Sequence, residues 1–249
     1  MNFTVTALDT TDSTQSDVKR LAAAGAPEGT VVTARHQRAG RGRRGHDWWD
    51  APGQSLLFSV LLRPAGPPAA VPQLSLVGGL AVAEALAETA SVAARIRWPN
   101  DLLVDGGKVC GILAEAASDG AGRVDHVILG IGINLNQTAF PATLRERATS
   151  LCLVTGRAYA AEPVLAAVLA HLGRRYAEWR VGGFAAPRAA WLERSTVPGQ
   201  LVRLPHGGEG PAVDVGDDGV LLARANDGRL LRIVSGEATL EVTAHAARH

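Results

Sequence analysis

Hydrophobic positions repeat with helical spacing in some parts of the chain and form short apolar runs in others. Helical repeats, bounded by capping residues, glycine or proline, predict helices at residues 12–25, 74–83, 163–179 and 185–193. Apolar and β-branched runs predict strands at residues 30–34, 55–62, 94–98, 102–104, 109–114 and 124–135. The segment at residues 74–83 is apolar on most of its sides, which predicts a buried helix. This mixture predicts an α/β (α+β) fold, in which helices flank a mixed β-sheet.

The pattern changes at about residue 197, where turn residues become frequent. Five short apolar segments follow at residues 200–204, 211–215, 220–225, 230–234 and 238–242, and turns that contain glycine separate them. Short strands at such regular spacing are typical of a small β-barrel. We therefore expect two domains, a larger one at residues 1–195 and a small C-terminal β-barrel at residues 196–249.

Composition narrows the classes of protein. The 249 residues include 25 Lys and Arg against 24 Asp and Glu, and this net charge of +1 disfavours nucleic-acid binding through overall charge. No apolar run approaches the roughly 20 residues of a membrane span, and residues 1–9 lack the layout of a signal peptide. Cys110 and Cys152 are too few and too far apart for a disulfide framework or a zinc site. We expect a soluble, cytoplasmic protein that does not bind a membrane.

A loop rich in arginine and glycine is the most informative segment. Residues 37–53 show no apolar periodicity, and Gly40-Arg41-Gly42-Arg43-Arg44-Gly45 lies within them. Glycine lets backbone amides approach a ligand and arginine binds phosphate with paired hydrogen bonds, so this loop fits a phosphate-bearing ligand. The same composition also fits a solvated loop or a contact with RNA. Trp48 and Trp49 follow, either to stack on a base or to enter the core.

Two further segments carry polar residues in apolar surroundings. Asn100 and Asp101, in Arg97-Trp98-Pro99-Asn100-Asp101, offer groups that read an adenine edge or hold a lysine or metal-bound water, although a turn explains the same residues. Lys108 is one of only two lysines, and its retention in an arginine-rich chain indicates a need for a compact ammonium. Gly130-Ile131-Gly132-Ile133-Asn134 has two glycines inside a strand, which indicates either close approach of another group or a bulge.

In this order, the segments resemble the catalytic core of the biotin–protein ligases. The matching residues are Asp12-Ser13-Thr14-Gln15, Gln37, Gly40-Arg41-Gly42-Arg43-Arg44-Gly45, Trp48, Trp98-Pro99-Asn100-Asp101, Gly107-Lys108, Gly111-Ile112-Leu113, Gly130-Ile131-Gly132-Ile133-Asn134 and, in the C-terminal barrel, Ser235-Gly236-Glu237. The resemblance covers nearly the whole chain and implies an adenylate-forming biotin–[acetyl-CoA-carboxylase] ligase. Biotin and MgATP would form biotinyl-5′-AMP and pyrophosphate, and a lysine of the biotin carboxyl carrier domain of acetyl-CoA carboxylase, or of a related carboxylase, would then attack the anhydride.

The resemblance also implies roles by position. Biotin binding is implied for Ser13, Thr14, Gln15, Gln37, Arg41, Gly42, Arg43 and Lys108, with the first three at the ureido ring. Binding of ATP or the adenylate is implied for Arg41, Arg43, Arg44, Trp48, Asn100, Asp101 and Asn134, with the tryptophan stacked on adenine. Lys108 and Arg43 are the implied catalytic residues, because joining two anions calls for positive charge rather than a general base. Mg²⁺ would come with ATP, near Asp101 or without a dedicated site, and no tightly bound prosthetic group is expected.

Three positions depart from the family pattern. Gln15 replaces the usual Asn, Arg97 replaces the usual Lys, and His46 replaces the usual Arg. Residues 1–11 are too short for the DNA-binding domain of some members, so we expect a monofunctional ligase that binds no DNA, as a monomer or weak homodimer. The alternatives are a lipoate or octanoate ligase or transferase of the same fold and a non-catalytic RNA binder; the arginine–glycine loop and Trp98-Pro99-Asn100-Asp101 favour biotin.

Overall fold

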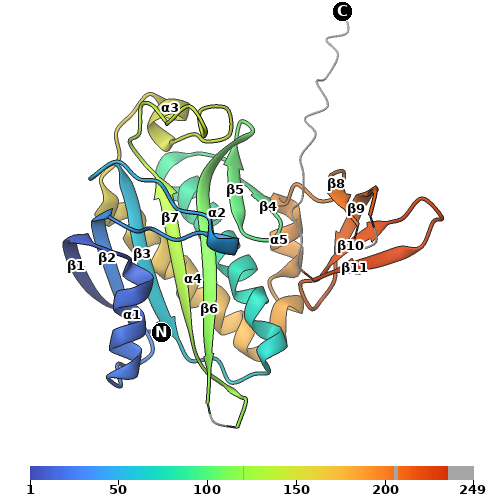
Figure 1. The fold of residues 1–249 in the computed structure, drawn as a ribbon, viewed down its shortest axis with the longest axis horizontal. Helices are drawn as coiled ribbons and strands as arrows, with labels where there is room; N and C mark the ends of the chain where they lie inside the picture. The colour runs from blue at the N-terminus through green and yellow to red at the C-terminus, as the bar shows by residue number, and fades with distance from the viewer. Residues whose placement is uncertain (120, 205–206, 235–249) are drawn as a thin grey trace, which may run out of the picture.

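A seven-stranded mixed sheet forms the centre of the molecule, in the order β1-β2-β3-β7-β6-β5-β4 (Figure 1). The structure is a computed structural model, and it describes residues 1–119, 121–204 and 207–234. β1 and β2 are parallel, and the other neighbouring strands are antiparallel. The strands are β1 (Thr4–Thr11), β2 (Thr30–Gln37), β3 (Ser55–Leu62), β4 (Arg95–Arg97), β5 (Asp101–Val104), β6 (Gly107–Ser118) and β7 (Val124–Asn134).

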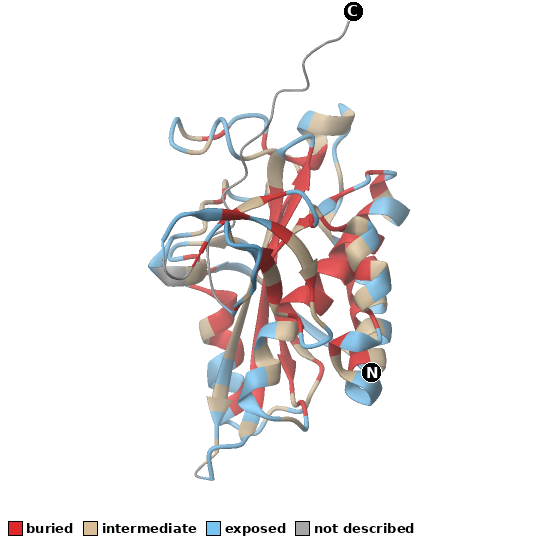
Figure 2. Ribbon diagram, turned by 90° about the vertical axis from the view of Figure 1, so that its right-hand side faces the viewer, coloured by how far each residue is buried: buried red, intermediate tan, exposed pale blue. Residues whose placement is uncertain are grey.

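Helices cover the two faces of this sheet unequally. α2 and α4 pack on one face and on each other, and they share the main apolar core with alternate residues of β3 and β7. On the other face, α1 covers only part of the sheet, over a small cluster around Val18, Val32 and Ile128. Figure 2 shows the buried residues concentrated in the sheet and on the sides of the helices that face it. The helices are α1 (Thr14–Ala23), α2 (Val71–Ala90), α3 (Leu151–Thr155), α4 (Ala161–Gly182) and α5 (Arg188–Arg194), with 3-10 turns at Arg43–Gly45, Pro68–Ala70 and Gly183–Ala185.

The C-terminal part forms a second, smaller sheet with the order β11-β10-β9-β8. Its strands are antiparallel: β8 (Leu201–Arg203), β9 (Glu209–Val215), β10 (Leu221–Arg224) and β11 (Leu230–Ile233). The predicted fifth strand at 238–242, and the Ser235-Gly236-Glu237 motif, lie outside the described residues. The small sheet contributes to the same apolar core as the large one, and the Trp98 indole donates to the Gly219 carbonyl at 3.1 Å. The predicted α/β fold class is confirmed, whereas closure of a barrel and a domain boundary at residue 195 stay predictions.

Helix α2 has an unusual composition for a globular protein. The stretch Pro68–Ala90 is long and apolar enough to cross a membrane by length and composition, although 67% of its most apolar window is buried inside the fold. The helix packs against the sheet and against α4 beside it, as expected for a core helix (Figure 1). Its apolar residues at 74–83 predicted a buried helix, and burial in the fold accounts for the composition.

Candidate active site

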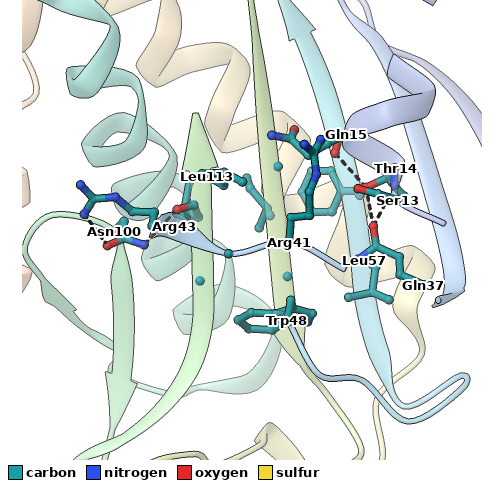
Figure 3. A pocket seen from close by; sticks show the side chains of 18 of the residues that line it. Ser13, Thr14, Gln15, Gln37, Arg41, Arg43, Trp48, Leu57, Asn100 and Leu113 are labelled. Atoms are coloured by element: carbon teal, nitrogen blue, oxygen red, sulfur yellow. Dashed lines mark hydrogen bonds between the residues drawn. The ribbon is translucent and has the colours of Figure 1, made fainter. Parts of the chain in front are cut away.

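A pocket opens on the face of the large sheet that α1 leaves partly uncovered (Figure 3). The start of α1, the end of β2, the arginine–glycine loop and the middle of strands β3, β6 and β7 all contribute to its wall. The lining residues are Ser13, Thr14, Gln15, Gln37, Arg41, Gly42, Arg43, Trp48, Leu57, Phe58, Ser59, Asn100, Lys108, Gly111, Ile112, Leu113, Gly130, Ile131 and Gly132. The structure therefore brings together in one pocket most of the residues that the sequence analysis singled out.

The first turn of α1 forms the deep end of the pocket. Gln37 Oε1 accepts from the Thr14 backbone amide at 2.8 Å and from its hydroxyl at 3.1 Å, and Thr14 Oγ1 lies 2.8 Å from Ser59 Oγ. Ser13 is the N-cap residue, yet its hydroxyl makes no capping bond. Ser13 Oγ and Gln15 Oε1 are buried without a hydrogen-bond partner in the described part of the chain. Buried polar atoms without partners cost free energy, and both residues line the pocket, so a ligand there can offset that cost by hydrogen bonding to them.

Glycines form the floor of the pocket, because the side chains of Trp48 and Gln15 lie directly on the strands there. Gly111 and Gly132 are paired across β6 and β7, and a Cβ on either would come within 2.7 Å of the Trp48 ring. A Cβ on Gly130 would come within 2.9 Å of the Gln15 amide. The close approach that the glycines of β7 predicted is confirmed, and the approaching groups are the chain's own Trp48 and Gln15.

The arginine–glycine loop is a small hairpin that reaches across the strands. Within it, the Trp48 amide donates to the Gly40 carbonyl at 2.9 Å and the Gly42 amide to the His46 carbonyl at 2.7 Å. Arg41 extends to Glu115 at 3.3 Å on β6, and Arg43 donates to Asn100 Oδ1 at 3.2 Å (Figure 3). The side chain of Arg44 lies outside the described residues.

Lys108 is held by a carboxylate at the edge of the pocket. Its Nζ lies 2.7 Å from Asp101 Oδ1, and the other oxygen of Asp101 accepts from Arg97 at 2.5 Å. Lys108 Nζ also lies 5.5 Å from the centroid of the Trp48 ring, within the range of a cation–π contact. Burial raises the pKa of the neighbouring Cys110 thiol far above its usual value, and the charge of Lys108 offsets this only in part. The Cys110 thiol is buried and holds its proton, so Lys108 and its ion-pair partners are the charged groups at this place.

Neither predicted asparagine is free of protein contacts. Asn100 lines the pocket, and its Nδ2 donates to the Ile112 carbonyl at 3.0 Å. Asn134 lies at the end of β7, two residues beyond Gly132, and does not line the pocket. Its Nδ2 donates to the Thr149 carbonyl at 2.9 Å, and its Oδ1 accepts from Gln137 at 3.2 Å. This asparagine thus fastens the segment before α3 beside the strand that carries Lys108.

Sequence reasoning missed two polar residues of this region. Ser59, which contacts Thr14, and Glu115, which contacts Arg41 and Gln15, both interrupt apolar strands. A polar residue inside an apolar strand was the signal that was available for both. Asp101 fits the predicted role of orienting Lys108. Both of its oxygens lie close to cations, and the described residues contain no group of three His, Cys, Asp or Glu that could hold a metal; a magnesium contact near Asp101 stays a prediction.

Known proteins resemble this chain in sequence. The model of the biotin/lipoate A/B protein ligase family matches residues 7–134. A bifunctional ligase/repressor, BirA, of Bacillus subtilis is 37% identical over 237 residues, which cover 93% of this chain and 72% of BirA. A biotin–[acetyl-CoA-carboxylase] ligase of Paracoccus denitrificans is 38% identical over 88% of this chain and 93% of its own length.

A solved structure extends the likeness to the fold. Biotin protein ligase from Aquifex aeolicus, in complex with biotin and ATP, superposes with a TM-score of 0.81 at 32% identity, over 94% of this chain and 97% of that one. Fold, matched segments and overall identity thus agree with the resemblance that the ordered motifs indicated. The chain belongs to the biotin/lipoate A/B protein ligase family, and within it to the biotin–protein ligases.

Proposed function

We propose that this chain joins biotin to ATP as biotinyl-5′-AMP and then transfers biotin to a lysine of a carrier protein. The observation that carries the proposal is the composition of one pocket. Among the described residues, it has buried polar atoms without partners at one end, at Ser13 and Gln15, and cationic side chains from Arg41, Arg43 and Lys108 at the other. Such a pocket suits a ligand with a neutral polar head and an anionic tail, and biotin has both.

The deep end of the pocket favours biotin over lipoate or octanoate. Ser13 Oγ and Gln15 Oε1 need hydrogen-bond partners, and the ureido ring of biotin offers N–H donors and a carbonyl acceptor. A dithiolane ring or an alkyl chain offers neither and would leave the two atoms buried and unsatisfied. Discrimination of this kind against a ligand that lacks the polar group is strong, because the cost falls on the wrong ligand.

The first step joins two anions. A carboxylate oxygen of biotin attacks the α-phosphorus of ATP, the bond to the bridging oxygen breaks, and pyrophosphate leaves. The carboxylate is already ionised at neutral pH, so the step requires positioning and charge stabilisation rather than a base. Lys108, oriented by Asp101, lies where its ammonium can bridge the reacting oxygens, and Arg41 and Arg43 supply the remaining charge.

The nucleotide lies, in this proposal, over the glycine floor. Trp48 stacks on adenine and Asn100 contacts its edge, while Arg44 contributes charge from the same loop. Asn134 reaches adenine if its Oδ1 exchanges the Gln137 amide for the adenine amino group. Mg²⁺ arrives on the ATP phosphates, since Asp101 is already paired with cations.

The second step needs a protein partner. The amine of a lysine attacks the carbonyl of the anhydride, the amide forms and AMP leaves, and the acceptor is a biotin carboxyl carrier domain of acetyl-CoA carboxylase or a related carboxylase. The loop at residues 38–53 closes over the adenylate and keeps water away until that partner arrives. We place this reaction in the cytoplasm, with the chain acting as a monomer or weak homodimer; the free thiols Cys110 and Cys152 suit a reducing compartment.

Exchange of labelled pyrophosphate into ATP tests the proposal directly. We expect exchange that depends on biotin and Mg²⁺, with little or none when lipoate or octanoate replaces biotin. Exchange with lipoate alone would assign the chain to the alternative chemistry of the same fold. If the chain retained RNA on filters and showed no pyrophosphate exchange with any acid, we would conclude that it is an RNA-binding protein and not a ligase.

A further inference from the structure

Glu115, on β6, contacts two parts of the site that are separate in the sequence. Its Oε2 accepts from Gln15 Nε2 at 3.2 Å and from the Arg41 guanidinium at 3.3 Å. Gln15 belongs to the first turn of α1 and Arg41 to the arginine–glycine loop, so one carboxylate oxygen joins the wall of the pocket to its cover. Glu115 itself lies outside the lining, with 39% of its side chain exposed.

This contact determines which way the Gln15 amide faces. A carboxylate oxygen only accepts hydrogen bonds, so the amide atom beside it must be the nitrogen. The oxygen, Oε1, then lies against the backbone of Gly130, within a buried side chain that is only 4% exposed. It has no hydrogen-bond partner in the described part of the chain. Gln15 lines the pocket, and its donor is already used by Glu115 whereas its acceptor oxygen is not.

We infer that Glu115 is a positioning residue for recognition of the acid substrate. It holds the Gln15 amide so that Oε1 accepts an N–H of the ligand, and it anchors Arg41 over the same ligand. The inference rests on the proposed function, because the ureido ring of biotin supplies that N–H. Without Glu115, the amide can turn over and set its own NH₂ against the N–H of the ring.

The length of the Gln15 side chain makes its contact with Glu115 possible. The side chain reaches Glu115 on β6 while it lies against Gly130, a residue without a Cβ. Recognition of the ring and anchoring of the loop share one carboxylate oxygen, so both respond to the same substitution.

A double-mutant cycle, with the biotin dissociation constant measured by titration calorimetry on the full chain, tests the inference. Glu115→Leu should weaken biotin binding about tenfold or more, as for loss of one well-placed hydrogen bond to a ligand. In a Gln15→Ala background the same change should cost clearly less than in the wild type, about threefold, because Glu115 then has no amide left to orient and only its contact with Arg41 is lost. Glu115→Gln keeps an acceptor oxygen for the amide and should stay within about threefold of the wild type.

Glu193→Leu is the matched control, since this glutamate is exposed on α5 and remote from the pocket. It should bind biotin as the wild type does. Equal losses from Glu115→Leu with and without Gln15, unchanged binding in Glu115→Leu, or equal losses in the Leu and Gln variants would each overturn the inference. A wild-type chain that binds no biotin would instead overturn the proposed function itself.

Discussion

The two faces of strand β7 have opposite compositions. Leu129, Ile131 and Ile133 belong to the main apolar core beneath α2 and α4. The glycines between them, Gly130 and Gly132, face the pocket, and the side chains of Gln15 and Trp48 lie against them. One face of the strand is filled by its own side chains, and the other leaves room for groups that arrive from elsewhere in the chain.

Polar side chains also differ between the two sides of the sheet. Behind it, buried Glu84 of α2 is bound by Arg174 and Arg175 of α4 and lies 3.2 Å from His171. On the pocket side, Ser13 Oγ and Gln15 Oε1 remain without partners among the described residues. Behind the sheet the buried carboxylate is paired by the fold itself, whereas in front of it we propose that a ligand supplies the missing partners. Changes behind the sheet should therefore affect stability, and changes in front should affect activity.

Removal of the ammonium in the pocket should have the largest effect. Lys108→Ala should lower the rate of adenylate formation about a hundredfold or more, as expected for loss of one key donor to the transition state. Pyrophosphate exchange measures this rate. Lys19→Ala is the matched control, because the second lysine of the chain is exposed on α1. Near-normal exchange in Lys108→Ala would remove this residue from the chemistry.

A change behind the sheet should destabilise the fold and leave the pocket intact. Glu84→Gln leaves Arg175 without its buried charge partner, and we expect a loss of about 2–3 kcal/mol in the free energy of unfolding at pH 7. Urea denaturation measures the loss, and the biotin dissociation constant should not change. A large loss of biotin affinity in this variant would contradict the separation of the two faces.

The pH dependence of that stability follows from the same residue. Burial alone raises the pKa of Glu84, but hydrogen bonds and charges from Arg175 and Arg174 outweigh it and lower the pKa below 4.5. A lowered carboxyl pKa stabilises the fold above the unfolded pKa and ceases to do so as pH falls through the folded one. The difference between wild type and Glu84→Gln should therefore shrink as the pH falls below 4.5.

The sequence predicted the fold where local pattern and tertiary environment agree. The apolar run at residues 55–62 became β3 with the same bounds, because a strand buried on both sides needs no polar alternation. Two elements were not predicted. β1 is an edge strand with mostly exposed residues, stabilised by its parallel pairing with β2, and no apolar pattern marks it. α3 has five residues and depends on its cap, in which Ser150 Oγ accepts from the Leu153 amide.

The site was predictable as a set of residues and not as a set of contacts. The glycines of β7 indicated that a group approaches the strand, but only the folded chain shows that the group is Trp48. Asn134 carried a predicted adenine contact, and its present partners are backbone and side-chain groups near α3. Such pairings depend on the register of strands far apart in the sequence, which residue patterns do not encode.

A single methyl group on each side of the sheet sharpens the comparison. Gly132→Ala places a Cβ within 2.7 Å of the rigid Trp48 ring, so the indole must shift, and we expect ATP affinity to fall about tenfold. Gly79→Ala, in α2 behind the sheet, meets its nearest atom at 3.4 Å, an ordinary contact. Alanine also favours a helix over glycine by up to about 1 kcal/mol, so this variant should be as stable as the wild type and fully active. Titration of ATP and thermal melting measure both, and unchanged ATP binding in Gly132→Ala would contradict the stacking role of Trp48.

The smallest expected effect concerns the loop in front of the sheet. Arg43 reaches across the pocket to Asn100, and Arg43→Gly removes this contact together with one positive charge over the adenylate. Loss of such a hydrogen bond corresponds to about a three- to tenfold faster release of biotinyl-5′-AMP, with more of the intermediate found in solution. Rapid filtration of enzyme loaded with labelled biotin and ATP measures the release, and protease cleavage at residues 38–53 reports closure of the loop. In the wild type, biotin with ATP should slow that cleavage, and in Arg43→Gly it should slow it less. Retention of the adenylate equal to that of the wild type would show that the loop closes without Arg43, and cleavage indifferent to both ligands would show that the loop does not cover the intermediate at all.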